Sequence, residues 1–195
     1  MASSFFPTPS PAPEPQRHVT PEWIRPPEDE YPSRILVREF LAQTAGTTLS
    51  VSHADVYSNG VVIKAAWEIR RTDETDAEWQ LATMHRMHGR SVEDALRFGV
   101  GFNDGTVVTT VDMASRVDIF NQRPTGWVLM EQGGGGGGGE DRYSGSSALW
   151  LWPLPPAGPI ELVAEWADRR IPESHLTLDG DAILAAVPHV RSLWR

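Results

Sequence analysis

The chain has 195 residues, of which 40% are hydrophobic and eight are tryptophan, so it can bury the core of one domain. Its formal net charge is −9. This acidic balance offers phosphate backbones and anionic membrane surfaces little to bind, so we expect neither nucleic acid nor a membrane as a partner. The absence of cysteine excludes disulfides and thiolate metal sites. No stretch has a membrane-spanning or signal-peptide pattern, and we expect a soluble, cytoplasmic protein.

The first segment in chain order is rich in proline. Nine of the 16 prolines lie in the first 33 residues, and proline occupies every second position from Pro7 to Pro15. Because proline lacks the backbone donor that helices and sheets need, residues 1–32 are predicted to form a disordered, polyproline-II-like tail. Such a tail is either a plain leader or a docking peptide for an aromatic groove. Trp23 and Ile24 are the first residues expected to touch the folded body.

Strand patterns begin at residue 33. Residues 34–43 and 47–58 place apolar side chains at the alternating positions that are typical of strands. Asn59-Gly60 follows and predicts a hairpin with a type I′ turn, because both central residues of that turn need positive φ. In residues 61–70 one phase of the alternation is apolar and includes Trp67, so this segment is predicted to be a half-buried antiparallel strand.

The middle of the chain has weaker patterns. Residues 79–89 suit either a strand or a helix. Ser91 precedes a segment with the pattern of one capped helical turn. Asp104-Gly105 lies between two apolar runs and predicts a hairpin with a two-residue turn, in which Phe102 faces Val107.

The C-terminal half returns to clear strand patterns and ends in a helix. Residues 181–187 have helical spacing with Asp179 or Asp181 as the N-cap, and Pro188 should end the helix. Strands are expected at residues 125–132, 142–152, 158–167 and 173–180. About eight or nine strands without long helical crossovers predict an all-β fold, a single antiparallel β-sandwich over residues 33–195 with a short C-terminal helix.

Seven consecutive glycines, residues 133–139, lie between two of these predicted strands. Phosphate-binding glycine loops carry a patterned motif with a lysine and lead into a helix, and here neither the lysine nor a helix follows. Unpatterned glycines give the unfolded chain its greatest freedom. We therefore expect a slack loop between strands, with a ligand-contacting flap as the alternative.

Few residues form a pattern that indicates chemistry. His85 and His88 share a face only if their segment is helical, where they can bind a metal ion; otherwise they are ordinary polar histidines. Trp150 and Trp152 share one strand face, where they either pack in the core or form a contact surface for a ligand or partner. No spacing pairs two carboxylates and no nucleophile motif occurs, so we assign no catalytic residue and no cofactor.

A resemblance covers roughly residues 95–195. The glycine run, the segment LWLWPLPPAGP (149–159) and the segment EWADRRIPE (165–173) resemble a group of β-rich proteins of actinobacterial type. That group combines a glycine-rich loop, a tryptophan-rich strand with a PLPP.GP connection, and an EW....IPE segment. Its members have no known activity, so the resemblance implies a soluble, β-rich body and transfers no functional residue.

Two functions are consistent with these observations. The first is a non-catalytic binding or interaction protein, which holds a protein partner or small ligand on a sheet face or at a loop end. The alternative is a metal-dependent enzyme that uses His85 and His88 with a nearby aspartate.

Overall fold

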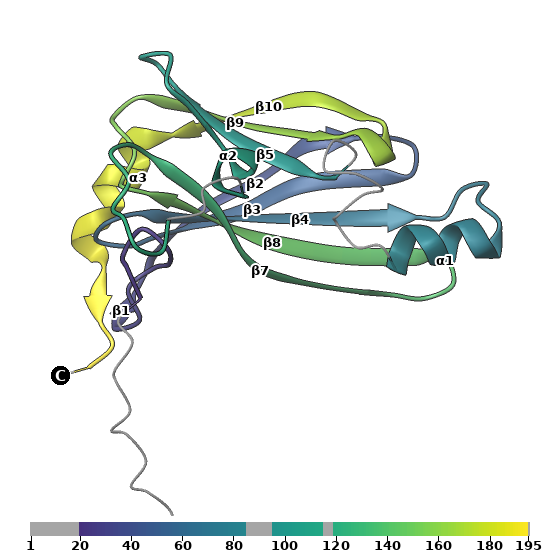
Figure 1. The fold of residues 1–195 in the computed structure, drawn as a ribbon, viewed down its shortest axis with the longest axis horizontal. Helices are drawn as coiled ribbons and strands as arrows, with labels where there is room; N and C mark the ends of the chain where they lie inside the picture. Colours follow the sequence, from purple (N-terminus) through teal and green to yellow (C-terminus); the bar gives the residue numbers. More distant parts are fainter. Residues whose placement is uncertain (1–19, 85–94, 115–118, 195) are drawn as a thin grey trace, which may run out of the picture.

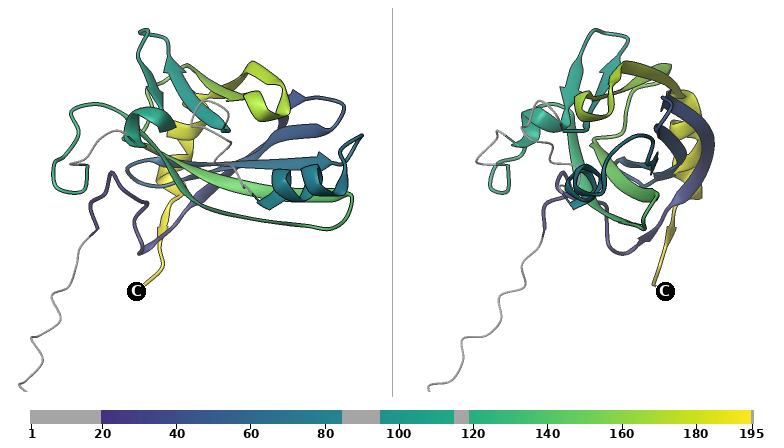
Figure 2. Two further views of the ribbon diagram at one scale, coloured as in Figure 1. Left: turned by 45° about the vertical axis from the view of Figure 1, so that its right-hand side comes forward. Right: turned by 90° about the vertical axis from the view of Figure 1, so that its right-hand side faces the viewer.

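The structure is a computed structural model that describes residues 20–84, 95–114 and 119–194. Two antiparallel sheets face each other, as Figures 1 and 2 show. The first has five strands in the order β2 (Ser33–Gln43), β3 (Thr47–Val56), β4 (Val61–Arg70), β8 (Arg142–Trp152) and β7 (Val128–Gly138). The second has four, in the order β10 (Ile171–Asp179), β9 (Pro159–Trp166), β5 (Arg97–Phe102) and β6 (Val107–Thr109). The predicted all-β antiparallel fold is confirmed.

Short elements complete the fold. Two strands of two residues each, β1 (Glu30–Tyr31) and β11 (Arg191–Ser192), pair with each other. The helices are α1 (Asp76–Met84), α2 (Thr110–Ala114) and α3 (Gly180–Ala186), and the 3₁₀ turns are η1 (Ala167–Arg169) and η2 (Val187–His189). The carboxylate of Asp179 accepts the Ala182 N–H at 3.0 Å, so Asp179 is the N-cap of the predicted C-terminal helix. The described part of residues 79–89 is helical, whereas Ser91 lies outside the described residues.

The main core lies between the two sheets. One phase of β4 points into it, as the alternation predicts, and each of its side chains is at most 4% exposed: Val61, Ile63, Ala65, Trp67 and Ile69. Trp67 stands edge-on to Trp166 of β9, with ring centroids 5.9 Å apart. Because edge-to-face rings attract each other beyond the area they bury, this pair helps to hold the sheets together.

A second hydrophobic cluster lies on the outer face of the five-stranded sheet. Its centre is formed by Trp150 and Trp152 of β8, which are 0% and 4% exposed. Ile24 is buried in this cluster and Trp23 packs against it, as expected for the first residues to touch the body. The Trp150 indole N–H donates to the Glu22 carbonyl oxygen at 3.3 Å, which fixes the segment across the sheet.

Residues 20–32 therefore belong to the folded body, although the sequence places them in the tail. Besides the cluster contacts, β1 pairs with β11, and the Leu193 N–H donates to the Asp29 carbonyl oxygen at 2.7 Å. The prediction failed because the high proline content of this segment does not reveal that its few apolar side chains pack on the outer face of the sheet. The remainder of the predicted tail, residues 1–19, lies outside the described residues.

The hairpin at Asn59-Gly60 is confirmed, but its predicted turn type is wrong. The Tyr57 N–H donates to the Gly60 carbonyl oxygen at 2.9 Å, and neither Asn59 nor Gly60 has positive φ. The glycine is needed for a different reason. A Cβ at Gly60 would lie 2.7 Å from Cζ2 of Trp150, so the missing side chain makes room for the tryptophan ring.

The hairpin at Asp104-Gly105 is also confirmed, with a register that differs by one residue from the prediction. Val107 faces the residue before Phe102 and not Phe102 itself. The Phe102 N–H donates to the Thr106 carbonyl oxygen at 2.9 Å, so the loop between them has three residues. Within it, Gly105 has a φ of +83°. A three-residue loop with a left-handed glycine is the next commonest hairpin after the two-residue turn.

The prediction of a slack loop for the heptaglycine is wrong. Residues 133–138 form the second half of β7, and residues 134–138 pair with residues 143–147 of β8. The turn between the two strands is closed by a hydrogen bond from the Gly139 N–H to the Arg142 carbonyl oxygen at 2.8 Å. Alternation of side chains is the pattern that marks a strand, and glycine has no side chain to alternate. The ladder here is made by the backbone alone.

Candidate functional site

The outer face of the five-stranded sheet carries the candidate site, because part of it stays open. The second hydrophobic cluster fills one end of this face. Next to it, small side chains form a shallow floor, which one row across the strands illustrates: Ser50, Ala66, Ser146 and Gly135 are register partners from β3 to β7. Side chains of this size leave the sheet surface close to solvent.

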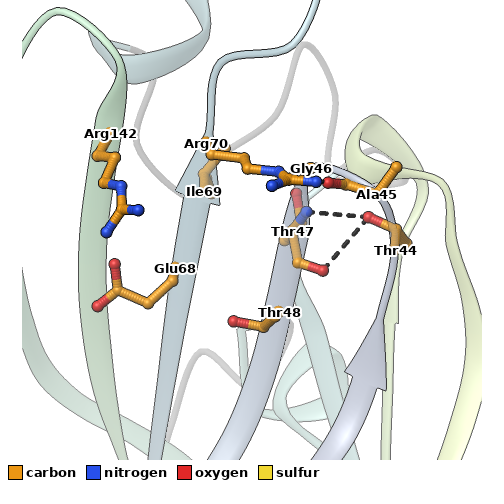
Figure 3. A pocket seen from close by; sticks show the side chains of 9 residues that line it. All are labelled: Thr44, Ala45, Gly46, Thr47, Thr48, Glu68, Ile69, Arg70 and Arg142. Carbon is orange, nitrogen blue, oxygen red and sulfur yellow. Dashed lines mark hydrogen bonds between the residues drawn. The ribbon is translucent and has the colours of Figure 1, made fainter.

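A polar pocket of about 470 Å³ lies at the far end of the same face (Figure 3). It is lined by Thr44, Ala45, Gly46, Thr47, Thr48, Glu68, Ile69, Arg70 and Arg142. The loop between β2 and β3 forms one wall and is braced by the Thr47 N–H, which donates to the Thr44 hydroxyl at 3.0 Å. Nε of Arg70 donates to the Ala45 carbonyl oxygen at 2.7 Å, so this guanidinium is fixed against the loop.

Two arginines on neighbouring strands line this pocket. Arg70 of β4 and Arg142 of β8 are direct register partners. Like charges in that position destabilise a sheet. The Arg142 side chain makes no hydrogen bond or ion pair with any residue that the structure describes. Figure 3 shows it directed toward Glu68. The pocket thus holds two cations and one carboxylate, and its excess positive charge favours an anion as ligand.

Sequence reasoning missed both arginines. Each stands at the end of a predicted strand, where charged residues are common and indicate nothing by themselves. Their pairing depends on β4 lying beside β8, and strand order between distant segments is not encoded in local patterns.

The two tryptophans considered as a contact surface are covered by the chain itself. Trp150 and Trp152 lie under Ile24 and its neighbours. The guanidinium of Arg123 lies over the Trp152 ring, 5.2 Å from its centroid. Of the two alternatives that the sequence left open, the structure places both residues in a hydrophobic cluster, on the outer face and not between the sheets.

The two histidines considered as metal ligands, His85 and His88, lie outside the described residues. Within residues 20–84, 95–114 and 119–194, no group of three or more histidine, aspartate or glutamate side chains is arranged to hold a metal ion.

One polar cluster beside the open face contains a serine, a histidine and an aspartate, the residue types of a serine-hydrolase triad, but arranges them differently from such a triad. Nδ1 of His53 lies 2.9 Å from the Ser52 hydroxyl, and its Nε2 lies 3.5 Å from the Asp55 carboxylate. That carboxylate is instead held by Arg34 through two hydrogen bonds of 2.7 and 3.1 Å. Burial lowers the pKa of His53, which the charge of Asp55 opposes. The arginine neutralises the carboxylate that a catalytic histidine would need, so we interpret the cluster as structural.

Comparison with protein-family models, with curated proteins and with solved structures finds no match for this chain. The site is therefore interpreted from its own chemistry. In the part of the chain that the structure describes, every helix is too short or too polar to cross a bilayer.

Proposed function

We propose that this is a non-catalytic binding protein whose ligand is a small polar molecule with a carboxylate or phosphoryl group. The observation that carries the proposal is the cross-strand pair of Arg70 and Arg142 inside a polar pocket. Arginine presents a planar fork of donors that matches both anionic groups. The cytoplasmic location expected from the sequence is part of the same proposal.

The other lining groups suggest what the rest of the ligand carries. The Thr48 hydroxyl and the Glu68 carboxylate also line the pocket, and both can accept hydrogen bonds from hydroxyl or amino groups. Sugar acids, sugar phosphates and amino acids combine such groups with an anion. The floor residues Ser50 and Ala66 lie two positions along their strands from Thr48 and Glu68, so a ligand longer than the pocket can extend along the sheet.

Calorimetric titration with a panel of compounds tests this function. The panel contains inorganic phosphate, citrate, glucuronate, glucose 6-phosphate and glutamate. We expect at least one to bind and to lose about tenfold or more in affinity in Arg142→Gln, because a hydrogen bond to a charged group contributes about 1.5–3 kcal/mol. Raising the ionic strength should weaken binding, since the site is open to solvent.

The matched control is Arg191→Gln, which removes an exposed arginine that lies over the Tyr31 ring, 5.2 Å from its centroid. This variant should bind as tightly as the unmodified protein. Equal losses in the two variants, or no binding across the panel, would count against the pocket. Stoichiometric zinc or manganese in the purified protein would favour the metal-dependent enzyme instead.

A further inference from the structure

The free edge of the five-stranded sheet is a strand without side chains over half its length. β7 has 11 residues and, among the residues that the structure describes, pairs with β8 alone. Its last six residues are exposed glycines, and Figure 1 shows β7 as the outermost strand of its sheet. An edge strand presents a row of unpaired N–H and C=O groups, which proteins usually protect with charged side chains, prolines or bulges. Residues 134–138 carry none of these.

The ladder determines which backbone groups face outward. The Gly139 N–H donates to the Arg142 carbonyl oxygen, so these two residues form a hydrogen-bonded pair. Bonded and non-bonded pairs alternate along an antiparallel ladder, so Gly134, Gly136 and Gly138 direct their N–H and C=O groups away from β8. A Cβ at any of these three would overlap with β8. The positions that offer open hydrogen-bonding groups are therefore the positions that only glycine fits.

We propose that this edge binds an extended segment of a partner protein, which adds to the sheet as a sixth strand beside β7. The inference does not depend on the arginine pocket. The outward N–H and C=O groups of the glycines would pair with the backbone of the added strand, as in other cases of strand addition. Since the glycines leave about 4.8 Å of strand width without side chains, large residues of the added strand can fold over them toward Ser144 and Ser146.

The acidic residues at both ends of the glycine run indicate which kind of segment the edge would bind. Glu131 precedes the glycines, and Glu140 and Asp141 form the turn after them. The side chains of Glu140 and Asp141 make no hydrogen bond or ion pair with any described residue. These acidic ends are about 30 Å apart at ~3.4 Å per residue. An extended segment with basic residues near both of its ends complements them.

A second copy of this chain fits the edge less well. Antiparallel pairing of β7 with itself would place Glu131 of one copy near Glu140 and Asp141 of the other, so acidic groups would oppose each other. Glycine would also lie against glycine, with no side chain to bury. We therefore commit to a basic-ended segment of another protein.

The probe is the synthetic peptide KTVTVTVK, added to the full chain labelled with ¹⁵N. Hydrogen exchange of the backbone amides is the readout. The amides of Gly134, Gly136 and Gly138 are open in the free protein, and we expect saturating peptide to slow their exchange by about tenfold or more. The amides of Gly135 and Gly137 already bond to β8 and should change little.

Modified peptides separate backbone pairing from other contacts. The same peptide N-methylated at its fourth and fifth residues lacks one hydrogen-bond donor on each edge. It should no longer slow the hydrogen exchange of the glycine amides. The acidic counterpart ETVTVTVE should bind at least about tenfold more weakly, and equal affinity would overturn the charge selection. Equal protection by the methylated peptide, or no protection by any peptide, would overturn strand addition.

Protein variants complete the test. Gly137→Lys adds a cation to the edge at a position where a Cβ meets no atom within 4 Å, so it should repel the peptide without unfolding the strand. Gly126→Lys adds the same charge outside β7 at a similarly open position and should leave binding unchanged. Protection that rises with protein concentration without peptide would show a second copy at the edge and overturn the proposal.

Discussion

Alanine substitution in the glycine run tests the assignment of residues 133–138 to a strand. Gly136 and Gly137 are adjacent in sequence and neither has positive φ. Their surroundings differ sharply. A Cβ at Gly136 would lie 2.8 Å from the Ser144 carbonyl oxygen, a distance that real Cβ atoms do not show, whereas a Cβ at Gly137 meets no atom within 4 Å.

The expected magnitude follows from comparing the two variants. Alanine restricts the unfolded chain equally at both positions, which favours folding by roughly 0.4–1 kcal/mol where the native backbone accepts it. Gly137→Ala should gain about that much. Gly136→Ala must also displace β8 or its own strand, and overpacking of this kind typically costs about 1–3 kcal/mol. Because the unfolded-state contribution cancels, the free energies of unfolding should differ by about 1–3 kcal/mol.

Urea denaturation followed by tryptophan fluorescence measures this difference, provided that the two variants have the same m-value. Gly135→Ala serves as a second control, because a Cβ there also meets no atom within 4 Å. A slack loop would accept alanine equally well at every position. Equal free energies of unfolding for Gly136→Ala and Gly137→Ala would therefore refute the strand, and the edge site with it.

Three further predictions concern other parts of the fold. Burial lowers the pKa of His53, so the unfolded chain binds a proton more readily than the folded protein does. The free energy of unfolding should therefore fall as the pH drops below 6.5, the ordinary pKa of histidine. In His53→Gln, the urea midpoint should fall less steeply with decreasing pH than in the unmodified protein. Trp67→Ala should cost about 3–5 kcal/mol and Glu68→Ala, on the opposite face, no more than about 0.5 kcal/mol, and similar small costs would contradict the register of β4. Ile24→Ala should cost about 2–5 kcal/mol in the same assay, whereas the exposed Arg25→Ala should be nearly neutral; equal effects would mean that the segment is not anchored.

The alternation of apolar and polar side chains correctly predicted the strands that have one buried face and one more exposed face. β4, β8 and β9 all fall where the pattern places them, because one face of each is buried between the sheets. The same reasoning failed for residues 133–138, which have no side chains to pattern. The Asn-Gly and Asp-Gly dipeptides predicted that two hairpins are present but not their geometry. Gly60 is required because the Trp150 ring leaves no room for a side chain, and Gly105 because a three-residue loop needs positive φ there.

The candidate site was less predictable than the fold. Arg70 and Arg142 become neighbours only when β4 and β8 pair, a contact between distant parts of the chain. Trp150 and Trp152 were correctly assigned to one face of a strand, but sequence patterns do not reveal which segment covers that face. The covering residues, 22–24, come from a stretch whose composition favours disorder.

The pairing of β1 with β11 makes the order of synthesis relevant to how this protein matures. On the ribosome, β2, β3 and β4 emerge early and can form hairpins with their immediate neighbours. β4 must then wait for β8, so its outer edge stays open while the intervening residues are translated. The Asp29 carbonyl gains its Leu193 partner only after residues 191–193 have left the exit tunnel. The early strands of the nascent chain therefore lack part of their pairing until the late strands are synthesised. A pause in translation before β8 would prolong the exposure of the β4 edge to other nascent chains.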